Sequence, residues 1–386
     1  MSDSQELADS SRREDFWSLP NWLNGPLCLL QIALGIAATM LSVLLFMLSL
    51  PKEPIWIVPG FIVGFSTVFL AVVTHELGHF LAARCCRIVV LRVRIGRWDV
   101  RILRTGWKLS RRPRTEPRLG GFVLAFMDPR GSWRRQQLCF VAGGPLANLT
   151  LAAVAGLAAM LLAGGAAQGA LLALSAANAC LGVANLLPAQ RKTVTSDGLW
   201  LLRWWRGLDI NHPQLAFMRL MGLACAGKCS DELPEEDLRL LEIQQQPMPL
   251  LALYIRLRAL LIQGEWQAAM ALGIVFQAQR SSLPETMQRA LYELLRLIAA
   301  ELAFAEAMAR RDASALSDDL LVPRLRREYA GIWARCLALR AELAGDEGER
   351  CRQLALGLEH ATNSPDLSLE REESRIQHCM LQSLRG

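Results

Sequence analysis

Residues 61–79 read FIVGFSTVFLAVVTHELGH, an uncharged apolar run that ends in three ionisable side chains within five residues. The pattern H-E-x-x-H places His75 and His79 on one face of a helix, where both imidazoles can bind one zinc ion. Glu76 lies beside them, where its carboxylate can take a proton from a coordinated water whose pKa zinc lowers to about 7. The sequence therefore predicts a hydrolytic zinc site with Glu76 as the catalytic base.

The apolar run before the motif gives the predicted site an unusual setting. Ionisable side chains at membrane depth are unfavourable, by about 2.5–3.5 kcal/mol for a charge at the centre of a span. A bound metal would compensate for several of them at once. A polar helix end in the headgroup zone is the alternative, since Arg84 is only five residues beyond His79. That alternative accounts for the polarity of the motif but not for its spacing.

The run belongs to one of four stretches long enough to cross about 30 Å of hydrocarbon. The predicted spans are 27–50, 55–83, 138–163 and 169–187. The composition agrees, with 52% hydrophobic residues and a mean hydropathy of +0.24. Four such runs in the first half of the chain disfavour buried helices of a large soluble protein. The polar N-terminus and the long first run also argue against a cleavable signal peptide.

Basic residues are concentrated between the second and third spans. Residues 84–135 hold fifteen Lys or Arg against three acids, whereas Lys52 is the only cation in the loops on the other side. The positive-inside rule predicts that this segment and both termini are cytoplasmic, in a multi-pass protein of a bacterial cytoplasmic membrane. The net charge of +6 therefore reflects the membrane and predicts no nucleic-acid binding. Tryptophans flank the spans as an interfacial belt would: Trp17, Trp22, Trp200, Trp204 and Trp205.

Apolar and basic residues alternate within the loop 84–137, most clearly over 88–95 and 100–102. The alternation, with turns at Gly96 and Gly106, predicts short strands in a small sheet that lies against the membrane. A phosphate-binding role for the basic run is the alternative. The positive-inside bias already accounts for these arginines, so the sheet is the favoured interpretation.

The second half of the chain changes from apolar to charged and helix-forming. Residues 199–206, LWLLRWWR, are typical of an amphipathic helix at the membrane interface. Residues 260–272, LLIQGEWQAAMAL, resemble a tetratricopeptide helix pair with a turn at Gly264, although a clean 34-residue period is missing. Such helices predict a docking surface for a protein partner, and an ordinary helical bundle is the alternative.

The predicted fold is therefore mainly α, a polytopic membrane protein with about four transmembrane helices, a small membrane-associated β segment and a soluble helical domain. The predicted parts are a cytoplasmic segment 1–26, a membrane core 27–200 and a cytoplasmic, tetratricopeptide-like domain 201–386.

Two histidines leave the predicted zinc ion short of a third protein ligand. The histidine that soluble metzincins carry six residues after the motif is missing beyond His79, and the other histidines lie outside the spans. A carboxylate is therefore favoured. Asp197 follows the last span and precedes Gly198, which permits a tight turn back toward the membrane. Asp99 and Asp128 are the alternatives.

Three motifs in this order resemble the site-2 protease family of intramembrane zinc metalloproteases. They are HELGH at 75–79, GGPLAN at 143–148, and NLLP at 185–188 followed by Asp197-Gly198. LGGFV at 119–123 is similar to that family's membrane-associated strand, and the resemblance covers about residues 55–200. One departure is that eight residues separate Pro188 from Asp197, more than is common in the family.

The resemblance implies a zinc cofactor with three protein ligands: His75, His79 and Asp197. It implies that Glu76 is the catalytic base and that Asn148 and Asn185 position the substrate, with interhelical hydrogen bonds as the alternative for each asparagine. The implied activity is hydrolysis of peptide bonds in or near transmembrane segments of membrane proteins, as in regulated intramembrane proteolysis. A catalytically inactive scaffold that recruits partners through the helical domain is the alternative. A metal transporter is disfavoured, since the spans carry few other polar residues.

Overall fold

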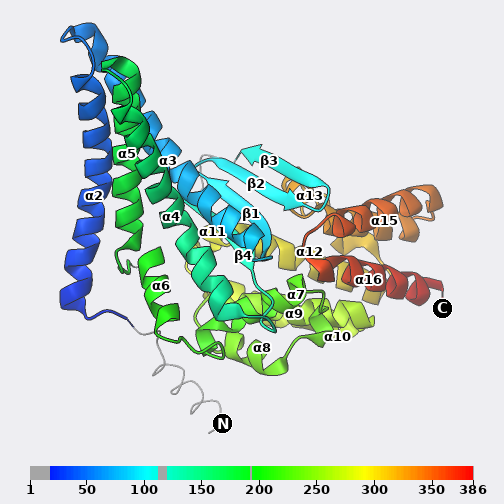
Figure 1. The fold of residues 1–386 in the computed structure, drawn as a ribbon. Helices are drawn as coiled ribbons and strands as arrows, with labels where there is room; N and C mark the ends of the chain where they lie inside the picture. The colour runs from blue at the N-terminus through cyan, green and yellow to red at the C-terminus, as the bar shows by residue number, and fades with distance from the viewer. Residues whose placement is uncertain (1–17, 112–119, 192–193, 386) are drawn as a thin grey trace.

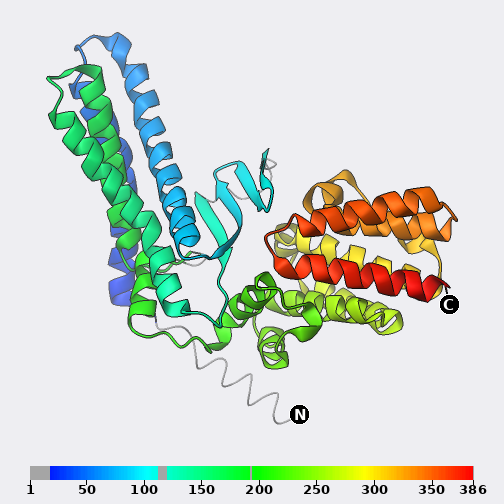
Figure 2. The same cartoon turned by 45° about the vertical axis from the view of Figure 1, so that its right-hand side comes forward.

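The computed structural model describes residues 18–111, 120–191 and 194–385, and most of them are helical (Figure 1). A bundle of long helices, a small sheet and a domain of shorter helices follow one another across the molecule (Figure 2). Trp17 and Leu119, which the sequence analysis names, and residues 1–17 of the predicted segment 1–26 lie outside the described residues.

The four predicted spans are long apolar helices of the bundle. They are α2 (Asn21–Leu48), α3 (Ile57–Cys85), α4 (Trp133–Met160) and α5 (Gly165–Leu186), with a short 3-10 turn, η1 (Pro54–Trp56), before α3. Each is long and apolar enough to cross a membrane. Large apolar side chains such as Leu29, Met40 and Phe65 are exposed on the bundle, as expected for a lipid-facing surface. The chain is accordingly an integral membrane protein.

Three of these helices begin several residues before the predicted spans, and α5 is one of them, with its start at Gly165 instead of residue 169. α2 begins at Asn21 instead of residue 27, and α4 at Trp133 instead of residue 138. Their extra turns make polar contacts with other parts of the chain. Asn24 donates to the carbonyl of Gln190 at 2.9 Å, and Arg134 donates to the carbonyl of Trp204 at 2.9 Å. The helices therefore extend beyond the apolar segment that the hydrocarbon requires.

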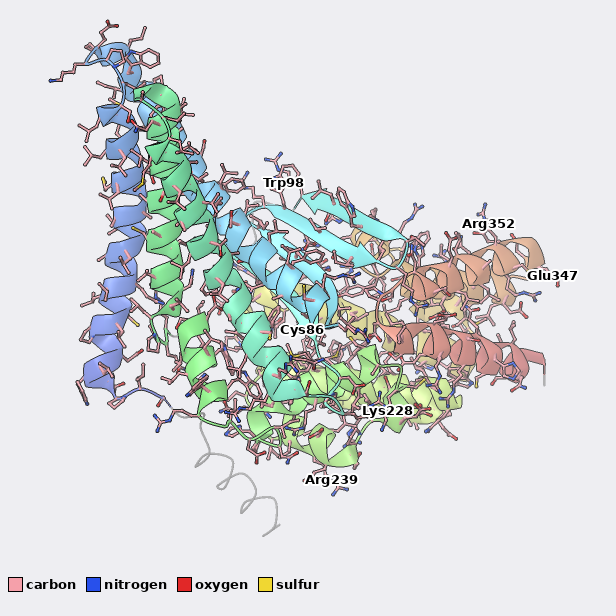
Figure 3. The ribbon with its side chains drawn as sticks, viewed as in Figure 1. Cys86, Trp98, Lys228, Arg239, Glu347 and Arg352 are labelled. Atoms are coloured by element: carbon pink, nitrogen blue, oxygen red, sulfur yellow. The ribbon has the colours of Figure 1, made fainter. Side chains whose placement is uncertain are left out.

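The predicted strands form one antiparallel sheet between α3 and the helical domain. Its strands are β1 (Val89–Ile95), β2 (Trp98–Leu103), β3 (Gly106–Arg111) and β4 (Gly121–Phe126), in the order β3-β2-β1-β4. The predicted turns are confirmed, since both Gly96 and Gly106 have positive φ. Strand β1 packs on α3 and α4 in an apolar cluster that contains Ala83, Val90 and Trp133. In Figure 3, Cys86 marks the end of α3 beside the sheet.

The helix predicted to lie at the membrane interface is α6 (Asp197–Trp205), and it packs into the protein. Trp204 is buried against Trp133, with ring centroids 5.8 Å apart. Trp205 is exposed, but Trp200 is only half-buried and Trp204 is covered. The expectation that all three tryptophans face the interface is therefore wrong for Trp204, because this side chain fills the junction between α4 and α6.

The second half of the chain is a helical domain. Its helices are α7 (Ala216–Cys225), α8 (Glu235–Glu242), α9 (Met248–Gln263), α10 (Trp266–Ser282), α11 (Glu285–Ala290), α12 (Tyr292–Arg310), α13 (Pro323–Glu328), α14 (Ala330–Leu343), α15 (Glu347–Thr362) and α16 (Leu367–Arg385). The predicted turn between α9 and α10 is confirmed, with Gly264 at φ 75°. The tetratricopeptide likeness stays a prediction. Figure 3 places Glu347 and Arg352 of α15 at the end of the domain far from the bundle.

The domain contacts the sheet at its β2–β3 end. Arg101 of β2 forms an ion pair with Glu328 and donates to the backbone carbonyl of Glu328 at 2.9 Å. Arg104 pairs with Glu370 at 2.9 Å, and the side chain of Asn363 accepts from the backbone N–H of Thr105 at 3.0 Å. The sheet is therefore attached to the helical domain through β2 and the β2–β3 turn, while β4 contacts both α3 and Phe217 of α7.

Candidate metal centre

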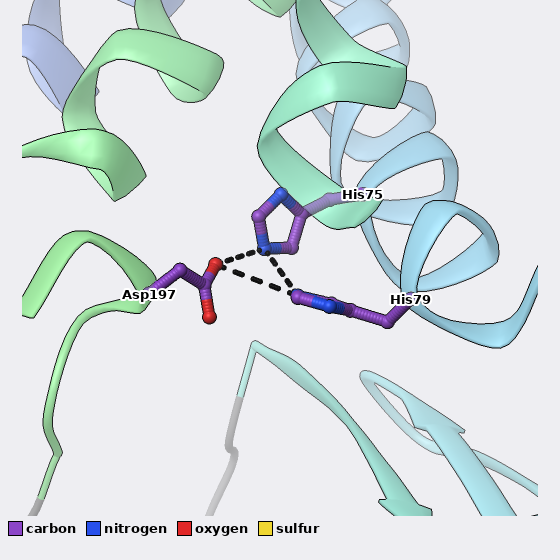
Figure 4. Close-up of side chains that lie close together, drawn as sticks. All are labelled: His75, His79 and Asp197. Carbon is purple, nitrogen blue, oxygen red and sulfur yellow. Dashed lines mark hydrogen bonds and ion pairs between the residues drawn. The ribbon is translucent and has the colours of Figure 1, made fainter. Parts of the chain in front are cut away.

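The three predicted zinc ligands lie together (Figure 4). His75 Nε2 lies 3.2 Å from His79 Nε2, and Asp197 Oδ2 lies 3.0 Å from the first of these nitrogens and 3.4 Å from the second. Ligand atoms in a tetrahedral zinc site, about 2.0–2.1 Å from the ion, are about 3.3 Å apart. The spacing of these atoms therefore fits a tetrahedral ion with one position left for a non-protein ligand.

The orientation of both imidazoles is fixed by hydrogen bonds at their other nitrogens. His75 Nδ1 lies 2.8 Å from Asn148 Oδ1, and His79 Nδ1 lies 2.8 Å from the backbone carbonyl of Phe140. Both partners are oxygen atoms that can only accept: a backbone carbonyl for His79 and an amide oxygen for His75. The amide nitrogen of Asn148 points elsewhere and donates to the carbonyl of Ala71 at 2.8 Å. Each Nδ1 therefore carries the proton, and each neutral ring presents an Nε2 lone pair.

These tautomers determine what can occupy the point between the side chains. Two nitrogen lone pairs and a carboxylate oxygen converge there, and such a set repels itself unless a cation lies between them. The donor set of two imidazoles and one carboxylate is one that zinc accepts.

Close packing of α3 on α4 brings the motif to its partners. A Cβ on Gly78 would lie 2.3 Å from the carbonyl oxygen of Gly143, and one on Gly144 would lie 2.4 Å from His79 Nε2. Side chains at these positions would push the two helices apart or block the ligand atoms. The glycines of HELGH and GGPLAN therefore allow α3 and α4 to approach closely.

Glu76 lies in the same buried region and is 5% exposed. Its Oε2 has no hydrogen-bond partner among the described residues. Buried carboxylate oxygens are nearly always satisfied, because an unpartnered one loses its hydration without compensation. The backbone of Gly121 lies directly against this carboxylate, since a Cβ there would be 2.5 Å from Glu76 Oε1. An acceptor is thus left available beside the three ligand atoms.

The long connection before Asp197 is folded into a hairpin, which explains how that residue reaches the histidines. Gln190 and Thr195 form an antiparallel bridge, and Ser196 donates through its backbone N–H to the carbonyl of Ala189 at 3.0 Å. The Ser196 hydroxyl donates to the carbonyl of Leu187 at 2.7 Å. The hairpin, named here for its described residues 189–191 and 194–196, therefore leaves the end of α5 and returns to it.

Ser196 also begins α6, because its hydroxyl accepts from the backbone N–H of Leu199 at 3.2 Å. The next residue, Asp197, is directed from this cap toward the two imidazoles. Gly198 is needed there, since a Cβ would lie 1.9 Å from the carbonyl oxygen of Leu186. The extra residues thus lengthen the chain without moving Asp197 away from the span.

A cavity of about 830 Å³ opens onto the centre. Its walls come from α2, α3, β4, α4, α5, the hairpin, α6 and α7. Asn185 lines it and donates to the carbonyl of Leu181 in its own helix at 3.1 Å. Asn148, by contrast, is fully buried behind His75 and uses its amide on protein partners. Of the two predicted substrate-positioning residues, only Asn185 borders the cavity.

Other candidates from the sequence lie elsewhere. Asp99 is buried in the sheet and pairs with Arg94 at 3.0 Å. Asp128 is paired with Arg130, and the hydrogen bond from that guanidinium holds the pKa of Asp128 below its usual value. In the helical domain, Cys229, Asp231 and Glu232 lie close enough to hold an ion. Both of these acids form ion pairs with arginines of α16, so their charges are already compensated without a metal ion.

Three contributors to the centre are not predicted by the motifs. Asn178 of α5 accepts from Asn148 at 2.8 Å, and an amide side chain within an apolar span is a sequence signal that could have revealed it. Gly121 lies within the predicted strand segment, but nothing in the neighbouring sequence indicates that it contacts Glu76. The contact of the Phe140 carbonyl with His79 cannot be predicted from the sequence either, since every residue has a backbone carbonyl.

Comparison with known families places this geometry in context. Residues 61–308, nearly two thirds of the 386-residue chain, match the family described as Peptidase family M50. The matching region begins in α3 before the motif and ends in α12. No curated protein and no solved structure matches the chain.

Proposed function

The chain belongs to peptidase family M50, the site-2 protease family, and from that membership we propose that it is an intramembrane zinc metalloendopeptidase. Its substrates are membrane proteins, cleaved in or near a transmembrane segment. The observation that carries the proposal is the convergence of His75, His79 and Asp197 beside the unpartnered Glu76 carboxylate, at the inner wall of a cavity between apolar helices.

His75, His79 and Asp197 hold the zinc ion. When bound, zinc supplies a Lewis acid that polarises the attacking water and the scissile carbonyl. Asn148 and the carbonyl of Phe140 keep each imidazole in the tautomer that a metal requires. The protein thus fixes the ligand geometry before substrate arrives, so little reorganisation accompanies the reaction.

Glu76 is the general base. Its carboxylate takes a proton from the attacking water and returns it to the leaving amine when the peptide bond breaks. Three features support this role: burial, an oxygen without a hydrogen-bond partner among the described residues, and adjacency to the ligand atoms on the same face of α3. A carboxylate held by a salt bridge would be a poorer base.

The edge of β4 orients the substrate. A transmembrane helix hides its peptide bonds in internal hydrogen bonds, so it must unwind before hydrolysis. β4 is the outermost strand on the side of the cavity, and residues 121–126 line that cavity. An extended segment can pair with such an edge through main-chain hydrogen bonds. Its scissile bond then lies above Glu76, which Gly121 contacts.

Cleavage occurs toward the cytoplasmic ends of the spans in the orientation that the basic loop predicts. The ligands lie near the end of α3 that leads into that loop. A product released from the cavity therefore enters the cytoplasm, as regulated intramembrane proteolysis requires.

The test compares membrane proteins of cells that express the wild type with those of cells that express Glu76→Gln. We expect fragments whose new termini fall within apolar segments in the wild type and their loss in the variant. Glu53→Gln, which changes an exposed acid in the loop before α3, is the matched control and should retain the fragments. Identical fragments in the wild type and Glu76→Gln would contradict the proposal.

Zinc content separates the enzyme from the inactive scaffold. The purified wild type should hold about one zinc ion per chain, and His75→Ala should lose it, because two ligands bind zinc far more weakly than three. Protein without stoichiometric zinc, together with an unchanged fragment pattern, favours a scaffold that acts through the helical domain.

A further inference from the structure

The hairpin at 189–196 is held firmly at the border of the cavity. Asn24 of α2 contacts it in both directions, donating to the carbonyl of Gln190 at 2.9 Å and accepting from its N–H at 2.8 Å. The Gln190 side chain accepts from Arg203 of α6 at 3.0 Å. Within the hairpin, the N–H of Arg191 donates to the carbonyl of Val194 at 2.9 Å. Elements on both sides therefore hold the described residues 189–191 and 194–196 in place.

Arg191 and Val194 line the same cavity as Glu76 and are exposed there. Among the described residues that line this cavity, Arg191 is the only lysine or arginine. Its guanidinium forms no ion pair with a carboxylate anywhere in 18–111, 120–191 or 194–385. The cavity thus carries a cation at its mouth, beyond the end of α5, and that cation has no protein counter-charge in the described chain.

We propose that Arg191 is a specificity-determining residue that binds an acidic side chain of the substrate, on the cytoplasmic side of the cleaved bond. The inference rests on the proposed protease function. A guanidinium matches a carboxylate with two parallel N–H donors, so it recognises Asp or Glu by geometry as well as charge. A substrate strand on the β4 edge would pass between that edge and the hairpin.

Repulsion is as important as attraction at this position. Most membrane helices carry Lys or Arg at their cytoplasmic ends. Such flanks would meet Arg191 as like charges at the mouth of the cavity, and like-charge repulsion disfavours their binding. Arg191 therefore selects the minority of membrane segments whose cytoplasmic flank is acidic and excludes the majority.

The test measures binding, so that it does not depend on turnover. The full-length Glu76→Gln protein is placed in nanodiscs with zinc. Its dissociation constants are measured for synthetic transmembrane peptides that share one Leu/Ala core and one neutral end. The other end carries Glu, Gln or Lys. We expect the Glu peptide to bind about tenfold more tightly than the Lys peptide.

Exchange of the Arg191 charge should change that ratio and nothing else. With Arg191→Gln the peptides should bind within about twofold of one another, and with Arg191→Glu the preference should reverse. Arg84→Gln removes an exposed charge near the same membrane edge but outside the cavity, and should keep the wild-type ratio. Unchanged zinc content in each variant excludes loss of fold as the cause.

Three outcomes would overturn the inference: the same ratio in all variants, an equal loss of affinity for every peptide in Arg191→Gln, or binding of none of them. The second would assign Arg191 to lipid headgroups. A reversed preference with no cleavage of any peptide by the chain that retains Glu76 would contradict the proposed function and leave the binding role of Arg191 standing.

Discussion

Two hydrogen bonds on the far side of the imidazoles determine what the HELGH motif can bind. The spacing of His75, Glu76 and His79 is local to one helix, so the sequence predicts their common face directly. Asn148 is different, because its contact with His75 depends on how α4 is rotated against α3. The sequence therefore predicts that this asparagine belongs to the site but cannot predict its position behind a ligand.

Replacing Asn148 with Ala should weaken zinc binding by about 10- to 100-fold, because His75 loses the acceptor that fixes its tautomer. Chelator competition on the purified chain measures the affinity. Asn185→Ala is the control, since Asn185 bonds only within its own helix in the described structure and should keep wild-type affinity. Zinc held as tightly by Asn148→Ala as by the wild type would show that the tautomer does not depend on this amide.

The substitution Gly121→Ala should displace the Glu76 carboxylate and lower proteolytic activity. The added Cβ would lie 2.5 Å from Glu76 Oε1, so the carboxylate must move from its place beside the ligands. Loss of a positioned base lowers the rate by roughly 100-fold or more. Gly120→Ala is the neighbouring control, because a Cβ there meets nothing within 4 Å. Fragment yield in the cell comparison is the measurement, and equal yields from the two variants would refute the contact.

At the scale of elements, the hairpin explains how the long connection after Pro188 still brings Asp197 to the two histidines. The reach of Asp197 toward the histidines is hard to predict from the sequence, since the hairpin is held in place by Asn24, which lies 166 positions before Gln190 in the chain. The presence of four spans is easier to predict, because about 20 consecutive apolar residues leave few alternatives. Helix ends are harder, because apolarity marks only the part that crosses hydrocarbon and the helix continues to its polar partners.

Ser196→Ala should loosen both the hairpin and the start of α6. The hydroxyl bonds three backbone groups, those of Leu187, Ala189 and Leu199. Loss of a helix cap alone lowers stability by about 0.5–2 kcal/mol. We expect zinc affinity to fall as Asp197 gains freedom. Ser175→Ala, which removes another hydroxyl bond within the bundle, should leave zinc affinity unchanged in the same chelator competition.

At the scale of the whole molecule, the helical domain is organised around a buried ion network. Glu301 of α12 pairs with Arg258 of α9 at 2.8 Å and with Arg335 of α14. The two arginines in turn contact Glu372 and Glu373 of α16. All five side chains are nearly or fully buried. No periodicity in the sequence predicts such a network, because its members come from helices far apart in the chain.

Glu301→Ala should destabilise the helical domain by about 3–5 kcal/mol, because two buried guanidinium groups lose their shared counter-charge. Chemical denaturation of the purified chain measures the change. Glu306→Ala on the same helix removes a partly exposed pair with Arg310 and should change the free energy of unfolding by less than about 0.5 kcal/mol. Similar values for the two variants would contradict the importance of burial.

The same network predicts the acid sensitivity of the domain. Burial alone would raise the pKa of Glu301, but the charges of Arg335 and Arg258 outweigh it and hold the pKa below its usual value. A lowered folded-state pKa stabilises the fold above the unfolded pKa, near about 4.3. That stability is lost as pH falls through the folded value. Stability measured against pH should therefore decline below about pH 4, and less steeply in Glu301→Gln.

The attachment of the sheet at both ends has a mechanical consequence. Strands about 4.8 Å apart place β3 roughly 14 Å from β4, and hydrogen bonds run across that whole width. Arg101 and Arg104 anchor the outer end to the helical domain, while Gly121 at the inner end lies against Glu76. A force on the domain can therefore reach the Glu76 carboxylate through the hydrogen-bonded strands. A force that acts on the helical domain is thereby carried to a side chain buried among apolar helices.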